Sequence, residues 1–279
     1  MIRTIFISRI NLLSGRTHVY NLSKTAEAIN AQENFEVILI TSSQVENTEA
    51  FFKRMGIKKP FKLIGFGLAP LPEVPALMII NLHFMAHLFS KRQNFDVLYF
   101  RDESLAPTAW FAKHILGKKV FFEIHSVLQS QKRQALNKIG ARVADGMIAI
   151  SAGLKRYYDR FNKNIIVSLC SAADDDWFDH TKDKKEWRRE LSLPLDAYVV
   201  GYTGVVGANP NNDYYEIDDV VRSLTALPKE IIFVVVGELN SNADWLRAIA
   251  KENKAEDRLI VVPWQERSSI PKYLQAFDL

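Results

Sequence analysis

Three apolar runs between residues 96 and 161 each end in side chains that could do chemistry. Arg101 and Asp102 follow the first run, His125 follows the second and Ser151 follows the third. An imidazole titrates near neutral pH, so it can donate or accept a hydrogen bond or carry a proton there. These four side chains are therefore the first candidates for a binding or catalytic site.

The elements around these residues predict where such a site would lie. Each apolar run is continuous and is followed by a polar turn and a helix-forming segment, as at 105–116 and 152–161. Strands and helices that alternate in this way form a parallel sheet with helices on both faces. Ligands of such sheets bind beyond the carboxyl ends of the strands, which is where all four side chains fall.

Two glycines occupy turns where the backbone could approach a phosphate group. Gly15 follows the first predicted strand, and Gly204 follows the strand predicted at 198–203. Glycine allows a close approach, and the helix after it supplies amide donors and a positive dipole end. Either residue could equally be an ordinary turn glycine. Arg16 and His18 come next to Gly15 and could meet an anion or cap the following helix in water.

The alternation of strands and helices divides the chain into domains. The acidic and charged stretch 171–194 interrupts the rhythm, and the second alternation then shows only three strands. We predict an α/β fold with an N-terminal Rossmann-like domain at 1–170, a connection at 171–194 and a partial second domain at 195–279. Three parallel strands make a poor independent domain, so the second domain is expected either to be small and lean on the first or to be an incomplete version of a longer one. The predicted strands are 3–9, 35–42, 62–66, 96–101, 119–125, 145–150, 164–169, 198–203, 231–237 and 258–262.

Length and composition exclude several classes of protein. A chain of 279 residues with 48% hydrophobic content is long enough for two domains. The single cysteine, Cys170, excludes an internal disulfide framework and a multi-cysteine zinc site. The first strand starts almost at once, and the longest apolar stretch, 76–89, is too short and polar to span a bilayer. We expect a cytoplasmic protein without a signal peptide.

The net charge of +4 conceals an uneven distribution along the chain. Residues 1–163 carry 23 Lys and Arg against 12 Asp and Glu, whereas residues 164–279 carry 13 against 20. The basic half could face an anionic surface such as phospholipid, which would place the protein at the inner face of the membrane. Alternatively, these charges are solvated loop and helix faces. We expect no nucleic-acid partner.

Two further patterns suggest metal binding but have simpler interpretations. His83 and His87 stand at i and i+4, the spacing of a metal pair on a helix, but no carboxylate accompanies them in register. The run 174–176 contains three aspartates, which we interpret as loop and helix-cap residues. We therefore predict no metal site and no cofactor.

The order of these elements resembles the GT-B glycosyltransferases, in particular the retaining group called family 4. The resemblance covers nearly the whole chain, and the order and spacing of its motifs carry it more than any single motif. The matching segments are Ser14-Gly15, 96–116, 122–125, 146–151, 153–155, 173–178, 201–204 and 234–238. The resemblance implies that the C-terminal part of the family's fold is missing from this chain.

What the resemblance implies for individual residues can be stated position by position. His125 matches the histidine that lies beside the donor sugar, where it could donate to a sugar hydroxyl or a departing phosphate oxygen, so we predict it to be catalytic. Strand-capping through backbone hydrogen bonds is the alternative role. The nucleotide-sugar donor is expected at Gly204, Asn209, Glu238, Trp264 and Gln265, where Trp264 could stack on the base or simply pack on the surface. The acceptor is expected at Gly15, Arg16, His18 and Arg101.

Two departures from the family pattern keep a second interpretation open. The turn 204–216 contains no cation, although the family uses cations there to neutralise the diphosphate. The family's paired glutamates also have no motif match in this chain. The first hypothesis is a retaining glycosyltransferase that moves a sugar from a nucleotide-sugar to a carbohydrate or lipid-linked acceptor. The alternatives are a catalytically inactive, glycosyltransferase-like partner subunit and a sugar-nucleotide epimerase.

Overall fold

Strands and helices alternate along the chain in the computed structural model and group into two compact units. Met1–Ser171 form the first unit and Ala172–Leu279 the second. The charge difference between the two halves of the sequence therefore coincides with the division into units. The structure describes residues 1–12, 17–45, 47–68, 73–127, 130–169, 178–207, 216–238 and 243–279.

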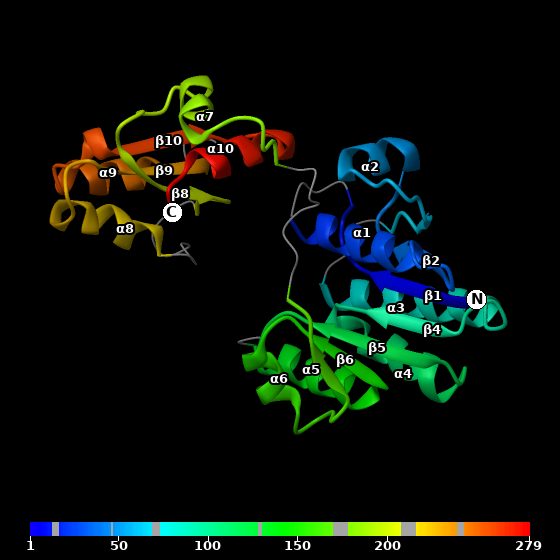
Figure 1. The fold of residues 1–279 in the computed structure, drawn as a ribbon. Helices are drawn as coiled ribbons and strands as arrows, with labels where there is room; N and C mark the ends of the chain where they lie inside the picture. The colour runs from blue at the N-terminus through cyan, green and yellow to red at the C-terminus, as the bar shows by residue number, and fades with distance from the viewer. Residues whose placement is uncertain are drawn as a thin grey trace. The chain divides into compact units, whose positions relative to one another are not determined.

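The first unit is built on a parallel sheet of seven strands (Figure 1). Their order across the sheet is β3-β2-β1-β4-β5-β6-β7. The chain thus moves outward from β1 in one direction and then returns to continue from β4 in the other, which creates a switch point between β1 and β4. The strands are β1 Ile2–Ser8, β2 Phe35–Thr41, β3 Lys62–Gly65, β4 Val97–Phe100, β5 Lys119–Ile124, β6 Gly146–Ala149 and β7 Ile165–Val167.

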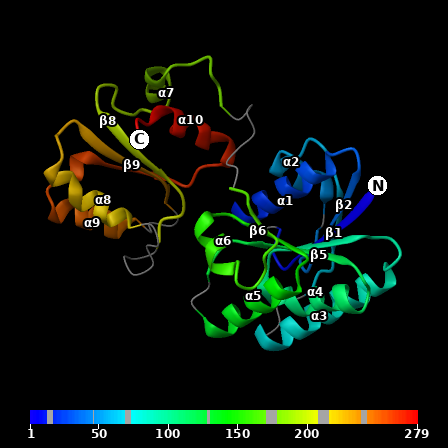
Figure 2. The same cartoon turned by 60° about the horizontal axis from the view of Figure 1, so that its bottom comes forward.

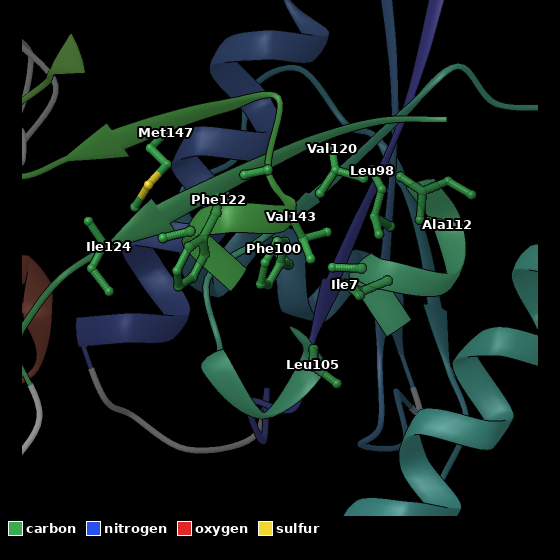
Figure 3. Close-up of a cluster of buried hydrophobic side chains, with 14 of the residues drawn as sticks. Ile7, Leu98, Phe100, Leu105, Ala112, Val120, Phe122, Ile124, Val143 and Met147 are labelled. Atoms are coloured by element: carbon green, nitrogen blue, oxygen red, sulfur yellow. The ribbon is translucent and has the colours of Figure 1, made fainter. Parts of the chain in front are cut away.

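Helices cover both faces of this sheet because successive strand residues point to opposite sides. One face packs on α3 (Glu73–Ser90), α4 (Ala106–His114), α5 (Gln131–Val143) and α6 (Ala152–Tyr158). Figure 3 shows the core of this layer, in which the rings of Phe100 and Phe122 stack with centroids 4.4 Å apart. The short η1 helix, Glu103–Leu105, joins β4 to α4.

The opposite face of the sheet packs on α1 (Thr17–Asn30) and α2 (Thr48–Met55). The strand residues that alternate with those of the first core point toward α1 and α2. Among them, Tyr99 stacks on Phe6 with ring centroids 4.2 Å apart. The ends of α2 follow local chemistry. Asn47 caps its first turn by accepting from the amide of Ala50, and Gly56 ends it at φ +60°, a left-handed conformation that suits glycine.

The second unit contains a parallel sheet of three strands in the order β10-β9-β8. Helices α8 (Ile217–Ser223) and α9 (Asp244–Glu252) cover one face, and α7 (Lys184–Glu190) and α10 (Ile270–Ala276) cover the other. The strands are β8 Tyr198–Thr203, β9 Ile231–Glu238 and β10 Leu259–Pro263. Short 3-10 turns at Leu224–Ala226, Glu256–Arg258 and Arg267–Ser269 complete the unit.

The last residues of the chain lie along the outer edge of β8. The amide of Leu279 donates to the carbonyl of Val199, and the amide of Gly201 donates to the carbonyl of Leu279. This pair of bonds has the parallel pattern, so the chain end runs in the same direction as β8. The α/β fold class with parallel sheets in both units is confirmed, with the three strands expected in the second.

The segment predicted as the connection, 171–194, includes helix α7. Its tryptophan, Trp187, is buried against Tyr273 and Ala276 of α10, so this part of the segment contributes to the core of the second unit. Within the described ranges, none of the helices has the length and apolar character needed to cross a membrane.

Candidate functional site

Four polar side chains lie together at the carboxyl ends of β4 and β5. Tyr99 lies in β4 and Arg101 directly follows that strand. Glu123 lies in β5 and His125 directly follows it. Residues two apart share one face of a sheet, and β4 and β5 pair with Phe100 opposite Phe122. The parallel register therefore sets the two polar pairs beside each other on the face that packs on α1 and α2.

Glu123 is the centre of this cluster. Its Oε1 lies 2.5 Å from His125 Nε2 and 3.4 Å from Arg101 Nε, and its Oε2 accepts a hydrogen bond from the Tyr99 hydroxyl. Arg101 Nη2 also lies 2.5 Å from His125 Nε2 and 3.4 Å from Nδ1. Because Nε2 faces a carboxylate, we assign its hydrogen to the bond with Glu123, which leaves Nδ1 as the acceptor of the ring.

The surroundings of Glu123 keep it ionised. Burial by itself would raise the pKa of this carboxyl, but the hydrogen bond from His125, the charge of Arg101 and the bond from Tyr99 outweigh burial and hold the pKa below its ordinary value. A buried carboxylate that accepts two hydrogen bonds and lies beside one guanidinium is therefore present at neutral pH. It fixes the orientation of the imidazole and compensates the charge of Arg101.

Arg101 has one donor that is not used within the described structure. Its side chain is only 9% exposed, and its Nη1 atom is buried without a hydrogen-bond partner there. A buried guanidinium hydrogen that donates to nothing is costly. Within the described residues, this donor therefore has no acceptor that would offset its burial.

The adjacent switch point between β1 and β4 holds an ion pair. Arg9, which follows β1, places Nε 2.7 Å from Oδ2 of Asp102, which follows β4. The other carboxylate oxygen of Asp102 accepts from the amide and hydroxyl of Ser104 and caps η1. Ser151 likewise caps α6, by accepting from the amide of Leu154. Asp102 and Ser151 thus act as N-caps of η1 and α6.

The structure unites some of the predicted residues and separates others. Arg101, expected to bind the acceptor, contacts the predicted catalytic residue His125. His18 is exposed near the start of α1, and Gly15 and Arg16 lie outside the described residues. Tyr99 and Glu123 were missed, although one signal was available. A glutamate two residues before His125, within an apolar strand, has to share the face of that histidine.

In the second unit the predicted donor residues gather at the carboxyl ends of its three strands. The amide of Gly204, after β8, donates to the carbonyl of Val236 at 3.0 Å, and the amide of Trp264, after β10, donates to the carbonyl of Glu238 at 2.8 Å. Gly237 has φ +129°, and a Cβ atom there would lie 2.0 Å from the carbonyl oxygen of Gly204. Only glycine permits this close approach of two backbones.

Side chains at this edge are differently engaged. Glu238 forms two parallel bonds with Arg247 of α9, at 2.6 and 2.7 Å, and this pairing lowers the pKa of Glu238. Its carboxylate is thus held by the protein itself. Trp264 is exposed, and the Gln265 amide donates to the carbonyl of Pro263. Asn209 lies outside the described residues.

The residues considered as metal ligands are engaged in other ways. The rings of His83 and His87 both pack near Phe66, with centroids 6.0 and 5.3 Å from its ring. Residues 174–176 lie outside the described ranges. Within the ranges that are described, no group of three or more His, Cys, Asp and Glu side chains could hold a metal ion.

Comparison of the sequence with known proteins points to glycosyltransferases. No family model matches the chain. An uncharacterised glycosyltransferase of Bacillus subtilis strain 168, YqgM, is 22% identical over 209 residues, which represent 71% of this chain and 55% of that protein. The chain therefore spans about half the length of this curated relative.

Comparison of the structure gives the same indication for the fold. Anabaena HepE in complex with UDP and glucose has a TM-score of 0.69 at 15% identity, covering 100% of this chain and 73% of that one. Sucrose-phosphate synthase of Thermosynechococcus elongatus has a TM-score of 0.71 at 16% identity, and the match covers 100% of this chain and 74% of that one. A putative UDP-N-acetylglucosamine 2-epimerase of Listeria monocytogenes has a TM-score of 0.67 at 10% identity, and the match covers 99% of this chain and 72% of that one. The chain thus has a GT-B-like fold, consisting of two Rossmann-like units, and resembles a glycosyltransferase in sequence.

Proposed function

We propose that this protein is a retaining glycosyltransferase that moves a sugar from a nucleotide-sugar donor to a carbohydrate or lipid-linked acceptor. The observation that carries the proposal is the buried cluster of Arg101, Glu123 and His125 at the carboxyl edge of the first sheet. Ligands of parallel α/β sheets bind at such edges. The sequence similarity to a glycosyltransferase and the fold shared with HepE, whose structure contains UDP and glucose, support the same assignment.

In this scheme the cluster at β4 and β5 acts on the transferred sugar and its leaving group. Glu123 accepts the Nε2 hydrogen of His125, so Nδ1 is the acceptor of the ring. In the described structure Nδ1 lies 3.4 Å from Arg101 Nη2, and a sugar hydroxyl would donate to it in place of that guanidinium. The unused Nη1 of Arg101 donates to an oxygen that gains negative charge as the glycosidic bond to phosphate breaks. The acceptor hydroxyl attacks the anomeric carbon, and the leaving diphosphate takes the hydroxyl proton.

The second unit supplies the donor site in this proposal. The Gly204 and Gly237 backbones lie so close together that only glycine fits, and the diphosphate of the donor would lie beyond them, at the carboxyl ends of β8 and β9. Trp264 offers an exposed ring on which a nucleotide base can stack. Glu238 then acts indirectly, because its carboxylate is paired with Arg247 and orders the start of α9.

Sugar transfer by the purified protein tests the proposal. The His125→Ala variant should release nucleotide from a UDP-sugar about 100-fold more slowly than wild type, since loss of a polar group that contacts the reacting sugar typically costs this much. His180→Ala, which removes an exposed histidine of the second unit, is the matched control and should leave the rate unchanged. Equal rates for wild type and His125→Ala would remove His125 from the reaction.

The products separate this proposal from its alternatives. A retaining transferase gives a new glycoside with the anomeric configuration of the donor, which NMR reads directly. An epimerase would instead convert the nucleotide-sugar without any acceptor, an activity suggested by the fold shared with the Listeria protein. An inactive partner subunit would give neither product.

A further inference from the structure

Helix α3 exposes apolar side chains on the side that faces away from the sheet. Met78 and Leu82 are 65% and 62% exposed, Phe89 is also exposed, and Met85 is partly buried. The spacing 78, 82, 85 and 89 places these four side chains in one line, which we call the α3 stripe. An exposed line of large apolar side chains on a helix normally marks a surface that contacts a partner or a membrane.

An apolar groove runs beside the α3 stripe. It has a volume of about 350 Å³ and lies between α3, η1, α4 and α5, with Met78, Leu82, Pro107 and Leu136 among its walls. Sites for small ligands start at about this size. The groove is therefore large enough to take part of a ligand.

The two polar residues in the lining of the groove, Asn81 and Ser104, offer little to a polar ligand, and the Ser104 hydroxyl donates to Asp102 at 2.6 Å. The Asn81 side chain donates to the carbonyls of Leu77 and Ser104 at 2.8 and 3.0 Å and accepts from the Thr108 hydroxyl at 2.6 Å. Its hydrogen-bonding groups are thus engaged within the protein. The rest of the lining is mostly aliphatic, so the groove suits an apolar chain.

The helices on this face of the sheet carry more cations than carboxylates. Helices α3, α4 and α5, which lie next to one another in Figure 2, contain five Lys and Arg and one carboxylate, Glu73, although Arg133 pairs with Glu103 of η1 and Lys113 with Asp145. Helices α1 and α2 on the opposite face together contain three Lys and Arg and two carboxylates. Lys91 and Arg92 are exposed just beyond α3, and the Arg92 guanidinium lies 4.6 Å from the centroid of the Phe89 ring. Trp110 of α4 is about half exposed.

We propose that the α3 stripe and its groove form the surface by which this protein docks on an anionic phospholipid bilayer. Met78, Leu82 and Phe89 enter the interfacial layer, Lys91 and Arg92 pair with lipid phosphates, and the groove takes one acyl chain or the apolar tail of a lipid. A second copy of the chain is a poorer occupant, because two such basic faces repel each other. The inference rests on the proposed function only in the role it gives this surface, which is to bring the transferase to a lipid-linked acceptor.

Vesicle flotation tests the apolar part of this surface. The protein should float with vesicles of equal parts phosphatidylglycerol and phosphatidylcholine and should dissociate as salt is added. The Met78→Glu/Leu82→Glu variant should bind at least about tenfold more weakly, since two charged side chains cannot enter the interface. The matched control is Ile166→Glu on β7, a side chain that is 58% exposed in the same unit, and it should bind like wild type.

Charge reversal tests the basic part. Lys91→Glu/Arg92→Glu should weaken binding about tenfold or more and reduce its sensitivity to salt, because each cation near an anionic surface contributes several-fold. Lys229→Glu/Lys251→Glu, two exposed lysines of the second unit, is the control and should leave binding unchanged. Tryptophan emission should shift to shorter wavelength on adding vesicles, and Trp110→Phe should lose this shift.

Three results would overturn the proposal. One is the absence of vesicle binding at low salt, and another is equal binding by wild type and the Met78→Glu/Leu82→Glu variant. The third is a wild-type dimer that this variant converts to a monomer in sedimentation, which would make a second copy the occupant. Transfer to a water-soluble acceptor is measured in the same preparations, so a protein that transfers sugar without binding vesicles refutes only this inference. Circular dichroism confirms that each variant is folded.

Discussion

At the scale of single residues, the central feature is a buried carboxylate that serves one guanidinium, one imidazole and one hydroxyl. Glu123 accepts from Tyr99 and His125 and lies beside Arg101. A buried ion pair of this kind adds little net stability when it is complete, but removing one member leaves an uncompensated charge. Its presence at the carboxyl edge of the sheet is better explained by what it does to the neighbouring imidazole and guanidinium.

Glu123→Gln tests this role. The amide keeps the size of the side chain but leaves Arg101 uncompensated, so the free energy of unfolding should fall by about 3–5 kcal/mol at neutral pH. Because the pKa of Glu123 is lowered in the folded state, its stabilisation is present above the ordinary value of 4.5 and is lost as the pH falls through the folded pKa.

The measurement is urea unfolding of both proteins from neutral to acid pH. The difference between wild type and Glu123→Gln should shrink as the pH falls below 4.5. A difference that stays constant would show that the carboxylate charge is not what the cluster needs. Tyr99→Phe serves as the matched comparison, since it removes one donor to Glu123 but no charge.

At the scale of elements, a single buried arginine holds three segments of the second unit together. Arg188 of α7 donates to the carbonyls of Ala276 at the end of α10, at 2.9 Å, and of Ala197 before β8, also at 2.9 Å. Its Nη2 contacts the carboxylate of Asp278, which in turn accepts from the amide of Val199. The same carboxylate pairs with Lys184. The chain end is thereby fixed along β8.

Asp278→Asn should weaken this arrangement. Burial alone would raise the pKa of Asp278, but the bonds from Lys184, Val199 and Arg188 lower it to about 2, from an ordinary value of 3.8. That shift corresponds to about 2 kcal/mol of stability, present above pH 3.8 and lost between pH 3.8 and about 2. Thermal unfolding of wild type and variant checks it. Asp196→Asn, which removes an exposed partner of Lys185, should change the stability little.

At the scale of the whole molecule, each unit has its own hydrophobic cores. The buried clusters around Phe100 and around Tyr99 draw only on the first unit, and those around Phe233 and Val234 only on the second. The units also differ in charge, with an excess of cations in the first and of carboxylates in the second. Each unit can therefore lose its packing without the core of the other being opened.

Calorimetry should resolve this independence as two unfolding transitions. Phe122→Ala, which empties part of the first core, should cost about 3–5 kcal/mol and lower only one transition. Asp278→Asn should lower only the other. If both variants shifted both transitions equally, the chain would unfold as one cooperative unit.

Much of this arrangement could be predicted from the sequence. The apolar runs 97–100 and 120–124, the second interrupted only by Glu123, identified strands that are buried on both faces, and the helical segments between them required a parallel sheet. The position of His125 after its strand placed it at the carboxyl edge of that sheet. The fold class followed from such local patterns because strand and helix periodicities are properties of neighbouring residues.

The partners of His125 were not predicted. Whether Arg101 reaches His125 depends on β4 and β5 being adjacent and in register, and it was assigned instead to the acceptor on the basis of resemblance. Glu238 was assigned to the donor, but its carboxylate is paired with Arg247, a residue nine positions later that the turn into α9 brings back. The exposure of Met78 and Leu82 could not be foreseen either, since apolar side chains are spread around their helix and do not mark one side as the buried one.

The amino-acid sequence alone thus determined the alternating elements, the parallel sheets, the division into a basic and an acidic part and the edge at which polar side chains gather. These are consequences of periodicity and composition. The tertiary structure decided which of those side chains touch, which are buried and which apolar face has no covering layer. Contacts of this kind depend on strand order, register and helix packing, which join residues far apart in the chain and leave no local pattern in it.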